Sequence, residues 1–202
     1  MVGRRIAGIL GLSQSRGAVL KNLSFDKIKA VIDRAPAQME KVEAKIGWFP
    51  SAKYANGTPV AYVAAIQEFG APEDHIPARP FLRPTIARDK DMWVKQLGRG
   101  VKDVLANRVT GHNVFAAIAT AGAQGVQKTI ASIHAPPLSP ITIMLRGMKL
   151  ADNDLVVTDE TVKQARAKVA RGEAPPKAPS LKPLVDTGTL IATVEGLAGE
   201  PE

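Results

Sequence analysis

Ten residues, His75 to Pro84, restrict the fold of this chain more than any other stretch of its sequence. They read HIPARPFLRP, with prolines at positions 77, 80 and 84. Each proline fixes its own φ, removes a backbone donor and restricts the residue before it, so the segment can form neither a helix interior nor a central strand. It also carries Ile76, Phe81 and Leu82, whose side chains favour burial. The sequence therefore predicts a stiff, extended connector that is fixed to a core.

The composition allows an ordinary core that contains few aromatic residues. Of the 202 residues, 45% are apolar and only 4% are aromatic, which leaves mainly alanine, valine, isoleucine and leucine to fill the interior. The net charge of +8 favours a polyanionic partner such as nucleic acid, although a basic surface that serves only solubility explains it equally well. The chain has no cysteine, which excludes disulfides, cysteine-based zinc sites and thiol nucleophiles.

Four elements are expected in the first half of the chain. Residues 1–23 are rich in glycine, serine and basic residues and predict a flexible basic arm, with no secretion signal and no membrane span. In the predicted helix Pro59–Phe69, the side chains of Tyr62, Ile66 and Phe69 fall on the same side, and we expect this side to be buried. The expected elements are a helix Phe25–Arg34 capped by Ser24, a strand Val42–Trp48, a helix Pro59–Phe69 and a long amphipathic helix from Pro84 to about Arg108.

The second half of the chain alternates helices with proline-rich connections. The stretch ATAGAQG inside one helix is tolerable if another backbone packs closely against it; the alternative is a loosely held helix. The expected elements are a helix from Val114 to about Ile133, a short helix capped by Ser139 that ends near Gly147, a strand or hairpin fragment Leu150–Val157, a helix Asp159–Arg171 capped by Thr158, a turn Asp186–Gly188 and a last strand Leu190–Val194. Few strands and several helices predict an α+β fold, with a small antiparallel sheet flanked by helices and a long amphipathic helix after the proline-rich loop.

A search for catalytic or metal-binding patterns finds no strong candidate. The three histidines, at positions 75, 112 and 134, lie in separate segments without metal-ligand spacing. Ser139 is outside a nucleophile elbow, and GRG at 98–100 lacks the rest of a phosphate-binding loop. The sequence DTG at 186–188 matches the aspartic protease motif, but a single copy in a helix-rich chain favours a structural turn of Asp186, Thr187 and Gly188, capped by Asp186. We therefore expect a protein without enzymatic activity and without a cofactor or bound metal.

Three segments, taken in order, carry a resemblance to a known family. They are Val63–Pro84, which contains AIQEFG and IPARPFLRP, Pro136–Lys149, which begins PPLSPIT, and Lys182–Leu190, KPLVDTGTL. Together they resemble the neck and tail-completion proteins of tailed bacteriophages, also called virion morphogenesis or minor tail proteins. The match spans most of residues 40–194, with some thirty residues, Leu150–Ser180, between the second and third segments.

This resemblance implies a structural protein of the virion. Family members form rings at the head–tail junction, between the head connector and the tail tube, and they are not enzymes. The implied partners are copies of the chain itself (six favoured, twelve as the alternative), the head connector or adaptor, and the tail terminator or tail tube, with a passing contact to genomic DNA and none to a membrane. The expected organisation is an arm at 1–23, a main α+β part at 24–149, an inserted helix and linker at 150–180, and a last part of the same domain at 181–202.

Two candidate surfaces follow from these expectations. The first is a subunit interface on the proline-rich connector, in which Phe81 and Leu82 are buried in the chain's own core while Arg79 and Arg83 face a neighbour; the alternative is that the whole loop serves its own fold. Its candidate residues are Ile76, Pro77, Arg79, Pro80, Phe81 and Arg83. The second is a DNA-facing stripe on the long helix, for which a solvated outer face is the alternative. Its candidate residues are Lys90, Lys95, Arg99 and Lys102.

Two other functions remain open at this point. One is a nucleic-acid-binding module that uses the basic arm, although the chain lacks the exposed aromatic pattern of single-strand binders. The arm's basic residues are Arg4, Arg5, Arg16 and Lys21. The other is an assembly factor that is absent from the mature virion.

Overall fold

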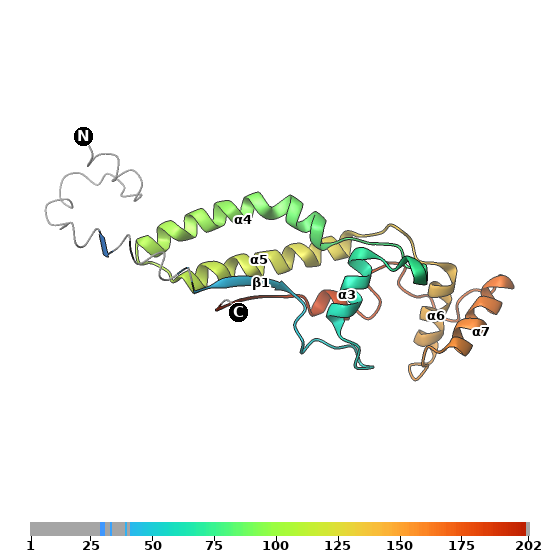
Figure 1. Ribbon diagram of the computed structural model, residues 1–202. Helices are drawn as coiled ribbons and strands as arrows, with labels where there is room; N and C mark the ends of the chain where they lie inside the picture. The colour runs from blue at the N-terminus through green and yellow to red at the C-terminus, as the bar shows by residue number, and fades with distance from the viewer. Residues whose placement is uncertain (1–28, 31–32, 34–38, 40, 201–202) are drawn as a thin grey trace. The chain divides into compact units, whose positions relative to one another are not determined.

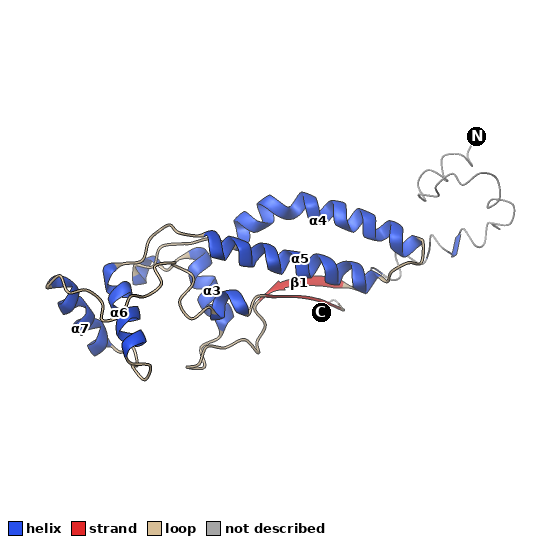
Figure 2. Ribbon diagram, turned by 180° about the vertical axis from the view of Figure 1, so that it is seen from behind, coloured by secondary structure: helices blue, strands red, loops and turns tan. Residues whose placement is uncertain are grey.

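The computed structural model describes residues 29–30, 33, 39 and 41–200, and these form an α+β fold (Figures 1 and 2). A small two-stranded antiparallel sheet is accompanied by six helices, which confirms the predicted fold class. In chain order the elements are β1 (Glu43–Gly47), α3 (Val60–Phe69), the 3-10 turn η2 (Pro72–Asp74), α4 (Leu82–Leu105), α5 (Gly111–Ser132), α6 (Pro140–Ala151), α7 (Asp159–Ala170), the single turn α8 (Thr189–Ala192) and β2 (Glu195–Gly199). The predicted arm 1–23 and most of the predicted helix Phe25–Arg34 lie outside the described residues.

The chain divides into two compact units, each built from segments that are distant in the sequence. The first, called here the ribbon unit, contains the described residues up to Gly47, then Ile86–Gln124 and the residues from Glu195 onwards. The second, called the connector unit, contains Trp48–Thr85 and Gly125–Val194. The three segments of the family resemblance all fall in the connector unit.

In the ribbon unit, strands β1 and β2 pack on the small residues of α5. The strands are antiparallel, with Ile46 opposite Gly196. A side-chain carbon on Gly196 would collide with the carbonyl of Ala119, and one on Gly122 would collide with Ile46. The glycine-containing stretch of α5 therefore has a closely packed neighbour, which is the first of the two alternatives that the sequence left open.

The core of the ribbon unit forms where α4 approaches α5. The two helices lie side by side in both views (Figures 1 and 2), and a side-chain carbon on Gly100 of α4 would collide with Val114 of α5. The packed cluster consists of Val104, Val114 and Ile118 with Trp93, Leu97 and Leu105 against them. Trp93, Leu97, Val104 and Leu105 of the predicted amphipathic helix therefore face this core. Ile86, which the sequence also predicted to face inwards, is 50% exposed.

The connector unit contains the helix pair α6 and α7, which lie against each other. Both helices have the caps that their sequences predict. The Ser139 hydroxyl accepts a hydrogen bond from Thr142 N at 3.1 Å, and Thr158 forms a reciprocal capping box with Thr161. Met144 of α6 and Ala165 of α7 are buried.

Both predicted strands in the second half of the chain are wrong. Helix α6 continues past Gly147 to Ala151, and residues 152–158 form no strand. The last strand begins only at Glu195, because residues from Thr189 to Ala192 form the helical turn α8 that follows Gly188, whose φ is +81°. Strand propensity indicated Leu190–Val194, but the strand forms where Gly196 lets a backbone approach α5.

Candidate functional site

The carboxylate of Glu68 joins the end of α3 to the beginning of α4. Glu68 is only 1% exposed. Its Oε2 accepts hydrogen bonds from Phe81 N at 2.6 Å and Leu82 N at 2.9 Å, and its Oε1 accepts from Arg83 N at 3.2 Å and Arg83 Nε at 2.9 Å. The next residue, Pro84, has no N–H, so the carboxylate accepts the free donors of the first turn of α4. The helix therefore starts at Leu82 and not at Pro84 as predicted.

The pKa of Glu68 reflects a balance between burial and hydrogen bonding. Burial alone would raise this pKa, because it disfavours the charged form. The backbone donors of Leu82 and Phe81 and the side chain of Arg83 outweigh that effect and hold the pKa below its ordinary value. The charged carboxylate is consequently the form that holds the connector in place.

Arg79 lies inside the protein and not on its surface. It is 5% exposed, and its guanidinium donates to Pro136 O at 2.9 Å, Pro137 O at 3.0 Å and the Gln67 side chain at 3.3 Å. Desolvation, and secondarily the charge of Arg146, lowers the pKa of Arg79 from its ordinary value. The prediction that Arg79 faces a neighbouring subunit is therefore corrected, because its donors are used within its own chain.

Phe81 is buried in the core of the connector unit, as predicted. Its ring meets Trp48 edge to face at 5.4 Å between centroids, and Trp48 Nε1 donates to Leu190 O at 2.9 Å. Leu82 is half-buried. Phe81 is accordingly part of the fold and is not available as a contact residue of the candidate interface.

The remaining candidates on the connector are partly accessible. Ile76 is half-buried and forms an isolated bridge with Ala71, with Ala71 N donating to Ile76 O at 2.9 Å. Pro80 is half-buried, whereas Pro77 is exposed. Before this bridge Gly70 has a φ of +79°, and a side-chain carbon there would lie 2.9 Å from Ala78 N. The turn into the connector therefore requires a glycine. Of the six candidate interface residues, only Pro77 and Arg83 are exposed.

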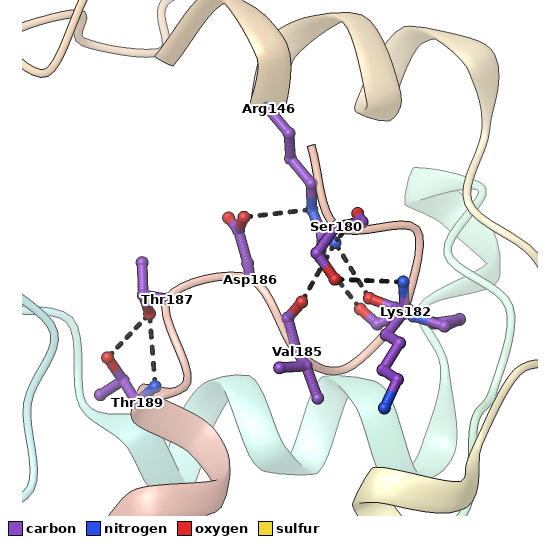
Figure 3. A network of polar contacts seen from close by, with 8 residues as sticks. Arg146, Ser180, Lys182, Val185, Asp186, Thr187 and Thr189 are labelled. Atoms are coloured by element: carbon purple, nitrogen blue, oxygen red, sulfur yellow. Dashed lines mark hydrogen bonds and ion pairs between the residues drawn. The ribbon is translucent and has the colours of Figure 1, made fainter. Parts of the chain in front are cut away.

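Arg146 holds the loop that contains the DTG sequence (Figure 3). Its guanidinium donates to four loop carbonyls, those of Ser180, Lys182, Pro183 and Val185, at 2.9 to 3.5 Å. Its Nε lies 3.5 Å from the Asp186 carboxylate. Desolvation lowers the pKa of Arg146, against the opposing effect of Asp186. This arrangement is a clamp between α6 and the loop.

The turn at 186–188 forms, but a different residue stabilises it. Gly188 adopts the left-handed backbone expected of a glycine, and it is itself the N-cap residue of α8. The Thr187 hydroxyl accepts from Thr189 N at 3.3 Å, while Asp186 points toward Arg146 (Figure 3). The predicted capping role of Asp186 is therefore wrong, and its carboxylate belongs to the Arg146 clamp.

Helix α3 exposes two of the three residues that the sequence predicted to be buried, Tyr62 and Phe69, while the third, Ile66, is half-buried. The residues that face the core are Val60, Ala64 and Glu68, whereas Tyr62 is 63% exposed and Phe69 is 68% exposed. The Arg83 guanidinium lies over the Phe69 ring, 5.2 Å from its centroid. We call the exposed set the α3 aromatic face; it consists of Ala61, Tyr62, Ala65 and Phe69 of α3 with Arg83 of α4.

Sequence reasoning missed this face because it treated aromatic residues as core residues. The available signal was the charged residue Glu68, which precedes a helix start that has no serine, threonine, aspartate or asparagine at its cap. If Glu68 faces inwards to supply that cap, Val60 and Ala64 face inwards with it. Tyr62 and Phe69 then lie on the outside.

The four candidate DNA-facing residues are all exposed on α4, but they do not share one face. At 100° per residue, Lys95, Arg99 and Lys102 fall within about 60° of one another around the helix. Lys90 lies about 140° away from Lys95 and about 180° from Arg99. The predicted stripe is therefore reduced to three residues, Lys95, Arg99 and Lys102.

The described part of the chain holds no group of three or more histidine, aspartate or glutamate side chains that could bind a metal ion. Within that same part, no helix combines the length and the apolar character needed to cross a bilayer. No protein-family model matches this chain, and neither a curated protein nor a solved structure matches it.

Proposed function

We propose that this chain is a structural protein of the bacteriophage virion that assembles with copies of itself into a ring at the neck, between the head connector and the tail tube. The order of the three resembling segments supports the family, and the α3 aromatic face supports assembly. A ring of six copies is favoured over one of twelve. Its neighbours are the head connector or adaptor on one side and the tail terminator or tail tube on the other, and it performs no catalysis.

The observation that carries the proposal is the composition of the α3 aromatic face. Tyr62 and Phe69 are two of only nine aromatic residues in the chain, and both are more than half exposed on one helix. Tyrosine, phenylalanine and arginine are enriched where protein surfaces meet, and tyrosine and arginine are frequent hot spots. Burying this face against a neighbour removes two large apolar side chains from water.

The polar framework behind this face suits it for ring assembly. A closed ring requires that each subunit presents the same surface at a fixed angle. Glu68 ties the end of α3 to the beginning of α4, and Arg79 ties the connector to the carbonyls of Pro136 and Pro137. Tyr62, Phe69 and Arg83 are therefore held on a rigid base, and little conformational entropy remains to be lost on assembly.

Cryo-electron microscopy of purified particles tests the proposed function. The expected result is a closed ring at the head–tail junction into which this chain fits, with the ring contact made by the α3 aromatic face. The copy number follows directly from the symmetry. If the chain is absent from purified particles, the structural role is wrong, and the assembly factor becomes the better explanation.

A matched pair of variants tests the contact itself. Replacing Tyr62 and Phe69 together by serine is expected to leave a folded chain whose particles fail to join heads to tails. The control replaces Val156 and Val157, which are 70% and 52% exposed on the loop before α7, by serine. Because both variants remove two exposed apolar side chains, equal numbers of joined particles from both would contradict the assignment of the α3 aromatic face.

A further inference from the structure

Three basic side chains gather on the outer face of α4, on the side away from the core of the ribbon unit. We call Lys95, Arg99 and Lys102 the α4 basic face; all three are exposed. Leu97 packs against the core cluster of Val104, Val114 and Ile118. Lys95 and Arg99 lie two residues to either side of Leu97, about 200° round the helix from it. The fold therefore turns these cations outwards.

The cations of the α4 basic face have no partner within the described part of the chain, so their charges are available to a ligand. Within residues 41–200, Lys95, Arg99 and Lys102 form no ion pair and no hydrogen bond through their side chains. By contrast, Arg88 pairs with Asp89 at 2.7 Å and Arg108 pairs with Asp103 at 2.7 Å on the same helix or just after it. Because Asp103 pairs with Arg108, its negative charge offsets the positive charges of the neighbouring Arg99 and Lys102 less.

The spacing of these side chains fits a polymer of closely spaced phosphates. From Lys95 to Lys102 the helix rises about 10 Å, and duplex DNA presents about six phosphates over that length. Lysine and arginine side chains are long enough to reach phosphates on one strand without entering a groove. The chain's net charge of +8 adds a general attraction to the same polyanion.

The surroundings of the α4 basic face favour a duplex over a single strand. Proteins that bind single strands stack bases on exposed aromatic side chains. Among the described residues, the large exposed aromatic side chains, Tyr62 and Phe69, belong to α3 in the connector unit, whereas Trp93 of α4 packs against the core. Three cations on a helix can contact the phosphate backbone of DNA, but they neither stack on bases nor read base edges.

We propose that the α4 basic face binds the phosphate backbone of duplex DNA, without sequence preference. The interaction stands on Lys95, Arg99 and Lys102 alone and does not require the chain to form a ring. Asp91, one turn before Lys95 and without an ion pair in the described residues, opposes this binding. Removing the charge of this carboxylate should therefore strengthen the contact.

The test measures binding of the full chain to a fluorescein-labelled DNA duplex by fluorescence anisotropy, over a series of salt concentrations. Replacing Lys95, Arg99 and Lys102 by alanine should weaken binding at least about tenfold at low salt and reduce the slope of log affinity against log salt by about 2.7, or about 0.9 for each phosphate contact. Asp91→Asn should tighten binding and leave the slope nearly unchanged.

Two control variants remove the same charge elsewhere. One replaces Lys128, Lys163 and Arg166, which are exposed on α5 and α7, by alanine, and the other replaces Lys21, Arg4 and Arg5 of the N-terminal segment. Each should retain most of the affinity of the parent chain. An equal loss in the α5 and α7 control would show that only net charge matters, and a loss confined to the N-terminal variant would assign binding to that segment; either result overturns the proposal.

The outcome is independent of the neck assignment. If the parent chain does not bind duplex DNA, the proposed role of the α4 basic face is wrong, while the proposed ring at the head–tail junction is unaffected. A chain that binds DNA through this face but is absent from purified particles would reject the ring and keep the inference.

Discussion

The two units of this protein are held together by different kinds of contact. In the ribbon unit, β1 and β2 lie on α5 because glycine and alanine allow the backbones to touch, as at Gly196 and Ala119. In the connector unit, buried and half-buried charged side chains hold the proline-containing segments in place. Glu68 accepts hydrogen bonds from the start of α4, and Arg79 and Arg146 donate to loop carbonyls.

The difference shows how a proline-rich segment can be fixed in place without secondary structure. Prolines remove donors, so the backbone cannot join a helix or a sheet ladder, and its carbonyls need donors from elsewhere. Arginine supplies several donors in a planar arrangement, which suits neighbouring carbonyls such as those of Pro136 and Pro137. The described residues of the ribbon unit contain no proline-rich segment, and its strands pack on α5 because glycine and alanine have small side chains or none.

The largest expected effect comes from breaking the connector unit at Glu68. Glu68→Ala removes the acceptor of three backbone N–H groups, of which that of Phe81 is buried, and should lower the free energy of unfolding by about 3 kcal/mol or more. Urea denaturation of the full chain measures this. Glu73→Ala, at an exposed glutamate in η2, is the control and should change it by less than about 0.5 kcal/mol. Similar losses in both variants would refute the capping role.

A smaller effect is expected from breaking the ribbon unit at Gly196. Gly196→Ala places a methyl group against the Ala119 carbonyl, which must move, and should cost about 1–3 kcal/mol in the same denaturation experiment. Gly199→Ala lies on the same strand with no atom near its added carbon, and it should cost much less. If the two variants are equally stable, the close packing of β2 on α5 is wrong.

The smallest effect is a pH dependence that separates the two kinds of contact. Because the pKa of Glu68 is lowered in the folded state, its contribution is present above its ordinary value of 4.5 and is lost as the pH falls through the folded-state value. Glu68→Gln should lose part of this acid dependence of the unfolding free energy, whereas Gly196→Ala should keep all of it. Parallel curves for Glu68→Gln and the parent chain between about pH 7 and pH 3 would contradict the lowered pKa.

Local signals in the sequence predicted several elements well. Ser139 and Thr158 begin α6 and α7 through their own side chains, Gly70 ends α3, and the alternation after Val42 gives β1. These features depend on a few adjacent residues. The burial of Phe81 was also predictable, because a large apolar side chain on a rigid connector favours burial in the core.

The sequence could not predict features that depend on distant partners. Arg79 was expected to face outwards because it is charged, yet the carbonyls that bind it lie 57 and 58 residues later in the chain. Asp186 was expected to cap its own turn, but its carboxylate forms an ion pair with Arg146 of α6. The inward side of α3 was misassigned for a different reason: the apolar pattern was followed, and Glu68 was not recognised as the residue that caps α4.

By itself the sequence determined the local geometry of this protein, namely where prolines exclude regular structure, where hydroxyl side chains cap helices and where glycines end or bend them. Those effects are set by sterics and hydrogen bonds within about one helical turn. Only the tertiary structure decided which charged residues are buried and which aromatic residues remain exposed. Burial of a charge requires several partners at once, and in the connector unit folding brings those partners together from far along the chain.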